Sequence, residues 1–353
     1  MEKLFQLFDT DDVAVTVQPL GSGKINHTYW VQGQRGAYVM QEVNTRVFPR
    51  PDVLMQNIDR VTRHLAEQQP EGRNLQVIRT RSGELAAKVN SGFWRCYNYL
   101  EQTTALDVVA TPKDAFAAAK GFGDFLYRLS DLPPDQVQPV LPDFHNVAFR
   151  VEQLDAAIRE DRVGREPGVR DVWNDIKLLQ TPILEVFQRI QSGAVPTRIT
   201  HNDTKISNVL LDAHSLEPVA VVDLDTVMPG SALFDVGDMI RTFVCPVDES
   251  EPDLSKISIR ADIFEALVAG YHEGTQGILT PTEKDMVVDA GKMLLFTQAI
   301  RFLTDYLNGD VYYKTDYPEQ NLVRTKNQWK LLSLLVQGEK DWRSLVRKVF
   351  YKF

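Results

Sequence analysis

The sequence predicts an α+β protein with two unequal parts: a small antiparallel sheet that carries one helix, and a larger helical part. Three observations indicate this division. Short β-branched and aromatic runs separated by glycines occupy residues 1–100, helical periodicity dominates after Thr111, and one predicted hairpin, at 208–224, interrupts the helices. We therefore expect a first domain at residues 1–100 and a second at 101–353.

The first domain is expected to contain short strands and a single helix. The strands are expected at 13–19, 29–31, 38–43, 75–79 and 93–100. The helix is expected at about 51–67, because Leu54, Ile58 and Leu65 recur at helical spacing. These elements together predict a mostly antiparallel sheet with one helix packed on it.

The second domain is expected to begin with a helix at Pro112. Thr111 can cap this helix, Pro112 suits its first position, and Asp114 lies at capping-box spacing from Thr111. Prolines at 133–134 end it. Further helices are expected near 147–160, 170–192, 260–275, 283–307 and 320–350. Apolar runs at 208–211 and 219–224 flank a polar turn and predict the hairpin.

The composition is that of a folded protein, with 43% hydrophobic and 25% charged residues among 353. No run approaches the roughly 18 apolar residues of a membrane helix, and acidic residues at 9–12 replace the apolar segment of a signal peptide. The net charge of −9 (39 basic against 48 acidic residues) argues against nucleic-acid binding. We therefore expect a cytoplasmic protein with no membrane or nucleic-acid partner. The two cysteines, Cys96 and Cys245, are expected as reduced, small hydrophobic residues.

One segment carries a polar pattern that suits phosphoryl transfer. In residues 201–208, Asp203 and Asn208 are five residues apart, and Asp223 follows beyond the predicted hairpin. Phosphoryl transfer from ATP needs a carboxylate that receives the hydroxyl proton and oxygen ligands for Mg²⁺. The spacing H-x-D-x-x-x-x-N, followed by a hairpin and an Asp, matches the catalytic loop and metal-binding Asp of kinases. Lys205, two residues past Asp203, is placed to touch the transferred phosphoryl group.

Weaker signals have ordinary structural explanations. The Gly21-Ser22-Gly23 turn has only two of the glycines of a phosphate-binding loop and no Walker lysine, so a plain hairpin turn is the alternative. His201 could indicate a metal hydrolase together with His145 and His272, but the six histidines lack metal-binding spacing. We interpret His201 as a histidine that holds the loop backbone.

Eight segments of the chain resemble the aminoglycoside phosphotransferase-like (choline-kinase-like) family of small-molecule kinases and, more narrowly, the N-acetylhexosamine 1-kinases. The segments are 21–29, 38–44, 93–100, 144–150, 199–212, 221–230, 234–241 and 301–310. The last three distinguish the hexosamine kinases from other members. The resemblance implies a bilobal protein-kinase-like fold with a nucleotide-binding N-lobe and a catalytic, substrate-binding C-lobe.

The same resemblance implies roles for individual residues. Asp203 would be the catalytic base, assisted by Lys205, and Asn208 and Asp223 would be the Mg²⁺ ligands. ATP would contact the glycine turn and the hinge, at Gly21, Ser22, Gly23, Lys24, Tyr97 and Tyr99. The sugar would contact His27, Asp225, Arg301 and Tyr317.

Two departures from the kinase pattern stand out. Gln41 occupies the position at the end of the third strand where kinases have a lysine, so the usual Lys–Glu pair is absent. Lys24 or Lys88 is the expected replacement. The sequence Asp223-Leu224-Asp225 lacks the glycine of D-F-G, so a mobile activation segment is not expected.

The function we expect is ATP-dependent phosphorylation of the anomeric hydroxyl of N-acetylglucosamine or N-acetylgalactosamine. The alternatives are a kinase of choline, homoserine, methylthioribose or an aminoglycoside, and a catalytically inactive nucleotide-binding regulator. The expected partners are the sugar and ATP, and we expect a monomer or a weak dimer.

Overall fold

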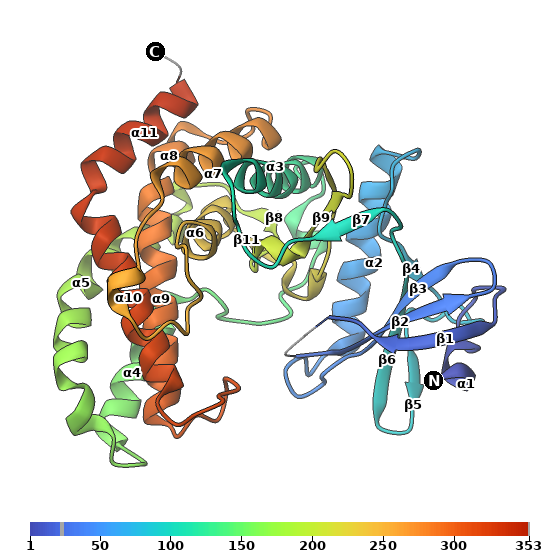
Figure 1. The fold of residues 1–353 in the computed structure, drawn as a ribbon, viewed down its shortest axis with the longest axis horizontal. Helices are drawn as coiled ribbons and strands as arrows, with labels where there is room; N and C mark the ends of the chain where they lie inside the picture. The colour runs from blue at the N-terminus through green and yellow to red at the C-terminus, as the bar shows by residue number, and fades with distance from the viewer. Residues whose placement is uncertain (22–24, 352–353) are drawn as a thin grey trace.

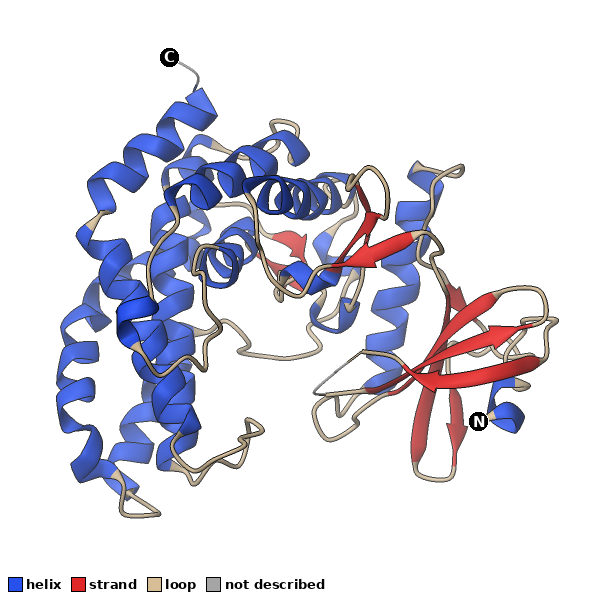
Figure 2. Cartoon of the chain, in the orientation of Figure 1, coloured by secondary structure: helices blue, strands red, loops and turns tan. Residues whose placement is uncertain are grey.

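Two lobes of different secondary structure make up the molecule (Figures 1 and 2). The structure is a computed structural model that describes residues 1–21 and 25–351. The N-lobe, from α1 to β6, is built around a sheet, and the C-lobe, from β7 to α11, is mainly helical. This arrangement confirms the predicted α+β class and its order along the chain.

An antiparallel sheet forms the body of the N-lobe. Its strands are β1 (Ala14–Pro19), β2 (His27–Gly33), β3 (Ala37–Glu42), β4 (Val77–Ile78), β5 (Ala87–Val89) and β6 (Gly92–Asn98). They pair in the order β1-β2-β3-β6-β4, and β5 also pairs with β6. The register places Gln41 of β3 directly opposite Arg95 of β6. That register decides the contacts made at the end of the third strand.

Two helices accompany this sheet. The predicted helix is α2 (Pro51–Gln68), which buries Leu54, Ile58 and Val61 along one face. The other, α1 (Glu2–Phe5), and strand β5 were not expected, because four- and three-residue elements carry too little periodicity to detect. Asp59 of α2 is buried, and its carboxylate accepts two hydrogen bonds of 3.0 Å from Arg79.

The first C-lobe helix is α3 (Pro112–Arg128). Thr111 and Asp114 form the predicted capping box. This helix packs against α7 (Ala261–Gly274) at very short range. A Cβ atom on Gly270 or Gly274 would lie 2.2 Å from a carbonyl oxygen of α3, so only glycine permits this approach.

The remaining helices surround α9, most of whose residues are buried. The central helix is α9 (Val287–Leu307), and the helices around it are α4 (Val147–Glu160), α5 (Arg170–Arg189), α6 (Ala232–Phe243), α8 (Pro281–Asp285), α10 (Gln320–Gln337) and α11 (Glu339–Tyr351). Helix α9 packs against α4, α5, α6 and α10 (Figure 1). The helix predicted at 320–350 is two helices that meet at Gly338, and that predicted at 283–307 is likewise interrupted at Met286.

Two small sheets in the C-lobe hold the predicted catalytic segments between them. The predicted hairpin is β9 (Val209–Asp212) and β10 (Pro218–Val221), joined by β7 (Thr103–Ala105). The second sheet pairs β8 (Arg198–Thr200) with β11 (Met228–Gly230). Segments 201–208 and 222–227 each connect one sheet to the other, so the two segments run side by side.

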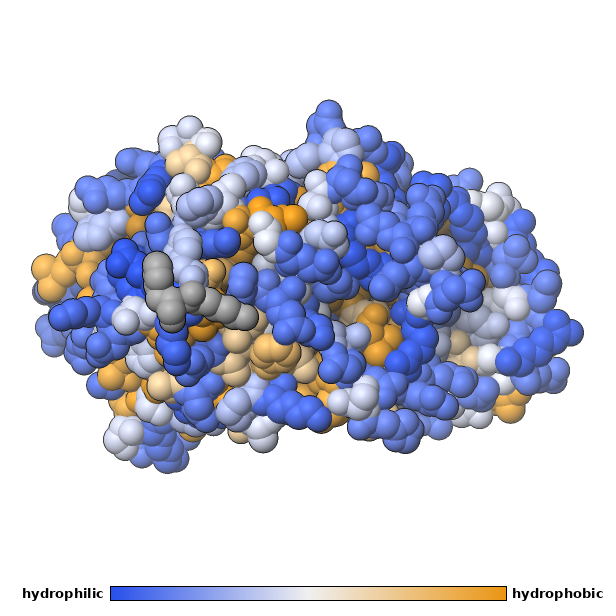
Figure 3. Space-filling model, turned by 90° about the horizontal axis from the view of Figure 1, so that it is seen from above, coloured by the Kyte–Doolittle hydropathy of each residue, from blue (hydrophilic) through white to orange (hydrophobic). Residues whose placement is uncertain are grey.

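The outer surface is largely hydrophilic in the view from above, with small scattered groups of hydrophobic residues (Figure 3). None of the helices in the described part of the chain is long and apolar enough to cross a bilayer.

Candidate active site

Helix α6 holds the backbone of the loop that carries Asp203. The buried carboxylate of Asp235 accepts the backbone N–H groups of His201 (3.1 Å) and Asn202 (2.7 Å). One turn later, Asp238 accepts the N–H of Thr204 at 2.9 Å. Burial raises the pKa of Asp235 to about 6, although both of these hydrogen bonds act in the opposite direction. The loop therefore has a rigid attachment within the C-lobe.

His201 connects the two catalytic segments. Its Nδ1 accepts the N–H of Asp203 at 3.2 Å, and its Nε2 donates to the carbonyl oxygen of Val222 at 3.0 Å. This pairing requires the neutral tautomer and occupies both ring nitrogens. His201 thus acts as a support for the loop, in agreement with our interpretation of this residue.

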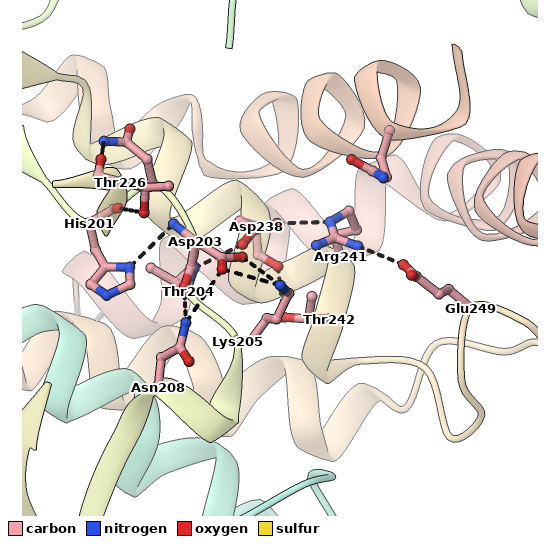
Figure 4. A network of polar contacts seen from close by, with 12 residues as sticks. His201, Asp203, Thr204, Lys205, Asn208, Thr226, Asp238, Arg241, Thr242 and Glu249 are labelled. Carbon is pink, nitrogen blue, oxygen red and sulfur yellow. Dashed lines mark hydrogen bonds and ion pairs between the residues drawn. The ribbon is translucent and has the colours of Figure 1, made fainter. Parts of the chain in front are cut away.

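Asp203 lies between a cation and an amide (Figure 4). The Lys205 ammonium is 3.0 Å from its Oδ1, and the Asn208 side-chain amide donates to its backbone oxygen at 2.9 Å. Burial would raise the pKa of Asp203, but the charge and hydrogen bond of Lys205, with a smaller contribution from the charge of Arg241, hold it below the usual value. Asp203 is therefore ionised at neutral pH and able to accept a proton.

Asn208 and Asp223 offer oxygen atoms that suit a magnesium ion. In the described residues, no group donates a hydrogen bond to the Asp223 carboxylate or to the Asn208 side-chain oxygen. Asp223 is exposed to solvent on one side, yet partial burial and the charges of Asp225 and Asp203 raise its pKa to about 7. An uncompensated carboxylate beside an amide oxygen fits Mg²⁺, which takes its other ligands from phosphates and water.

No group of three or more His, Cys, Asp or Glu side chains with metal-binding geometry occurs within residues 1–21 and 25–351. The histidine cluster that a zinc hydrolase would need is therefore not found in this part of the chain. His145 instead donates from Nε2 to the carbonyl oxygen of Asn202 at 3.0 Å. Burial lowers the pKa of His145 to about 4 and keeps it neutral.

The residues predicted to contact the nucleotide are only partly described. Gly21 is exposed and has the left-handed φ of 70° that favours glycine, whereas Ser22, Gly23 and Lys24 lie outside the described residues. The Tyr97 side chain is buried in the core, 5.4 Å from the Arg95 guanidinium carbon. The ring of Tyr99 packs edge-on against Trp30 at 6.4 Å.

Asp225 lies at the boundary between the lobes, where it bonds N-lobe side chains. Its Oδ1 is 2.5 Å from Nη1 of Arg95, and its Oδ2 accepts a hydrogen bond of 2.7 Å from Asn26. Both carboxylate oxygens of this buried residue are thus engaged by N-lobe side chains. His27, next to Asn26 in sequence, is exposed, and its Nδ1 lies 3.3 Å from Glu42.

Arg301 of α9 lies among aromatic rings. Its guanidinium carbon is 5.4 Å from the ring centre of Phe144, 5.6 Å from that of Tyr313 and 5.9 Å from that of Tyr312. Phe144 in turn packs against His145, which contacts the loop of Asp203. Tyr317 lies in the segment that follows α9 and is 40% exposed.

The sequence analysis missed Arg95, Asp235 and Asp238. Arg95 could have been found from its place opposite Gln41 if the strand register had been known. Asp235 and Asp238 lie in segment 234–241, which is one of the eight segments that carry the resemblance. The resemblance assigned no role to either residue. Of the cations considered for the missing lysine, Lys88 pairs with exposed Asp52 at 3.1 Å. The buried cation beside Gln41 is Arg95.

Comparison with known proteins agrees with this geometry. A family model described as the phosphotransferase enzyme family matches residues 16–276. The chain is similar to a solved spectinomycin phosphotransferase in complex with ADP and spectinomycin, at 12% identity over 96% of this chain and 97% of that chain, with a TM-score of 0.62.

Two further solved structures share the fold. A microcompartment-associated aminopropanol kinase is 15% identical over 97% of each chain, with a TM-score of 0.62. A choline/ethanolamine kinase family protein from Mesorhizobium loti is 13% identical over 94% of this chain and 92% of that chain, with a TM-score of 0.55. These similarities confirm the kinase-like fold. Because the family model runs from β1 to just beyond α7, well over half of the chain, the protein belongs to the phosphotransferase enzyme family.

Proposed function

We propose that the protein is an ATP-dependent kinase that phosphorylates the anomeric hydroxyl of an N-acetylhexosamine to give the 1-phosphate. The observation that carries the kinase assignment is an ionised Asp203 beside two oxygen donors, Asn208 and Asp223, that suit magnesium. Such a site needs little covalent chemistry, because phosphoryl transfer depends mainly on positioning and charge stabilisation.

In this proposal Asp203 accepts a hydrogen bond from the sugar hydroxyl and then its proton as the oxygen attacks the γ-phosphorus in line. Lys205, now paired with Asp203, presents its ammonium to the phosphoryl group in transfer. Asn208 and Asp223 hold Mg²⁺, which neutralises charge on the phosphates of ATP. The attachment of the loop to α6 keeps Asp203 in place during transfer.

The charges near Arg301 favour a neutral acceptor. Arg150 and Arg301 are close enough that the charge of Arg301, after burial, lowers the pKa of Arg150. A cationic amine would be repelled by these two guanidinium groups. An acetamido sugar offers a carbonyl oxygen and hydroxyls as acceptors for Arg301, and apolar ring faces for Phe144 and Tyr313.

One observation favours a second candidate, a nucleotide-binding regulator without activity. Gln41 replaces the lysine of active kinases. The catalytic base and both proposed metal ligands are nevertheless present, so we favour the enzyme.

The test is ADP release from Mg-ATP with a panel of acceptors: N-acetylglucosamine, N-acetylgalactosamine, glucose, choline, homoserine, methylthioribose and an aminoglycoside. We expect turnover with at least one N-acetylhexosamine and a product whose anomeric carbon couples to phosphorus in NMR. Turnover with choline or an aminoglycoside alone would refute the sugar assignment. Nucleotide binding without turnover on any acceptor would favour the regulator.

A further inference from the structure

Gln41 occupies the position of the missing lysine, and both the oxygen and the nitrogen of its side-chain amide form hydrogen bonds. Gln41 accepts a hydrogen bond of 2.9 Å from Nε of Arg95 and donates one of 2.9 Å to the Thr28 hydroxyl. Its amide is therefore oriented by β2 on one side and orients Arg95 of β6 on the other. Only 1% of the Arg95 side chain is exposed, so this guanidinium does not reach solvent.

Arg95 and its neighbours attach the segment of Asp223 to the N-lobe. The guanidinium bonds Asp225 at 2.5 Å, and Asn26 bonds the other oxygen of that carboxylate at 2.7 Å. Asn26 is itself held by the backbone N–H of Asn44 at 2.9 Å. One residue separates Asp225 from Asp223, so the position of the proposed metal ligand depends on a chain of contacts that begins at Gln41.

The negative charges of Asp223 and Asp225 explain why a cation is needed beside Asp225. Asp225 is buried and lies two positions from Asp223 in the chain. A buried carboxylate needs a cationic partner, the more so beside a second carboxylate. Arg95 compensates Asp225 and leaves the charge of Asp223 available for a metal ion.

We propose that Arg95, on the strand beside the position of the absent lysine, is a positioning residue that fixes Asp225 and through it the Asp223 carboxylate. Glutamine is then required at position 41, because a lysine there would put a second cation against Arg95. The inference rests on the proposed function in that it assumes a metal–nucleotide site at Asp223.

Restoring the residue that kinases have should therefore harm this protein. In Gln41→Lys, the new ammonium lies where the amide now accepts from Arg95, and it repels the buried guanidinium. The double variant Gln41→Lys/Arg95→Gln again has a single cation opposite a neutral amide. We expect the double variant to be at least about tenfold more active than Gln41→Lys, as for coupled neighbours.

Binding provides a test that does not depend on catalysis. We would measure ADP affinity with and without Mg²⁺ by titration calorimetry for wild type, Arg95→Met, Gln41→Lys and the control Arg73→Met. Residues that support metal ligands typically contribute about 10–100-fold to metal affinity. In Arg95→Met and Gln41→Lys we expect a loss of about this size in the Mg²⁺-dependent part of ADP affinity, with metal-free ADP affinity nearly unchanged.

Arg73→Met is a matched control because it removes another ion pair between the lobes, Arg73 with Asp212 at 2.6 Å, away from Asp223. We expect it to keep wild-type Mg²⁺ dependence. If Arg95→Met does not fold, Gln41→Lys and the double variant carry the test.

Three results would overturn the inference: wild-type activity in Gln41→Lys, unchanged Mg²⁺-dependent ADP affinity in Arg95→Met, or an equal loss in Arg73→Met. Failure of the proposed function is distinguishable. A wild-type protein that turns over no acceptor, but loses Mg²⁺-dependent ADP binding in Arg95→Met, refutes the kinase and supports the role of Arg95.

Discussion

The two carboxylates at the centre of the site differ in how they are attached to the lobes. Asp203 lies on a loop whose backbone is bonded to Asp235 and Asp238 of α6, entirely within the C-lobe. Asp223 lies on a segment that is bonded to both lobes, because His201 of the C-lobe bonds the Val222 carbonyl while Arg95 and Asn26 of the N-lobe bond Asp225. The segment of Asp223 therefore has an attachment to the N-lobe that the loop of Asp203 lacks, so loss of that attachment should affect Asp223 more than Asp203.

Two ion pairs between the lobes differ in how deeply they are buried. Arg95 and Asp225 are 1% and 5% exposed, whereas Arg73 and Asp212 are 41% and 21% exposed. Breaking a buried pair leaves an uncompensated charge, while exposed pairs contribute little to stability. A buried pair beside the site is consistent with a need for exact placement rather than with holding the lobes together.

The largest effect is expected from Asp203→Asn, which removes the proposed base and leaves the N-lobe attachment of Asp223 intact. We expect kcat to fall by about 10²–10⁴-fold, with ATP affinity nearly unchanged. Steady-state kinetics and calorimetric titration with ADP measure the two quantities. Turnover at the wild-type rate would show that Asp203 is not the base.

A smaller loss of kcat is expected from Asp235→Asn. The amide has one acceptor oxygen where the carboxylate has two, so one of the two loop N–H groups loses its partner inside a buried region. We expect kcat to fall by about tenfold, the equivalent of one neutral hydrogen bond. Mg²⁺-dependent ADP affinity should fall less than kcat, since the bonds of Asp225 to Arg95 and Asn26 remain. An equal loss of kcat and of Mg²⁺-dependent ADP affinity would show that these bonds do not hold Asp223.

The pH dependence should reveal Asp223 separately from Asp203. The pKa of Asp223 is raised to about 7, and metal binding requires the ionised form. Below pH 7 the ionised fraction falls about tenfold per pH unit, so kcat/KM for ATP should decline. Because Mg²⁺ competes with the proton, higher Mg²⁺ should move this decline to lower pH. If the decline of kcat/KM at low pH does not respond to Mg²⁺, a group other than Asp223 causes it.

The smallest effect is expected from Arg73→Met. This variant breaks the exposed pair with Asp212, and the free energy of unfolding should change by less than about 1 kcal/mol. Denaturant unfolding measures this free energy, and kcat is measured on the same variant. A loss of activity comparable to that of Arg95 variants would show that any contact between the lobes matters equally.

Local signals in the sequence determined much of the C-lobe and of the catalytic loop. The capping box of Thr111 and Asp114, the hairpin of β9 and β10, and the spacing of Asp203 and Asn208 each involve residues a few positions apart. Such contacts form within one turn or one loop, so their pattern is visible in the chain. The family and the kinase-like fold were implied by the resemblance of eight longer segments.

Helix α6 was not predicted, although Asp235, Asp238 and Arg241 recur at helical spacing on one face. Ten of its twelve residues are buried, including Asp235 and Asp238, so this polar face lies inside the protein. The charges on this helix serve the catalytic loop rather than solvent. Their role is apparent only when 201–204 and α6 are seen together.

Only the tertiary structure decided which cation accompanies the metal ligand. Arg95 and Asp225 are 130 positions apart, and Arg95 and Gln41 are 54 apart on strands whose register the sequence does not state. The sequence by itself determined that a lysine is missing at position 41 and which residues could bind magnesium. Strand pairing and lobe packing, which depend on the whole core, placed Arg95 where that charge is needed.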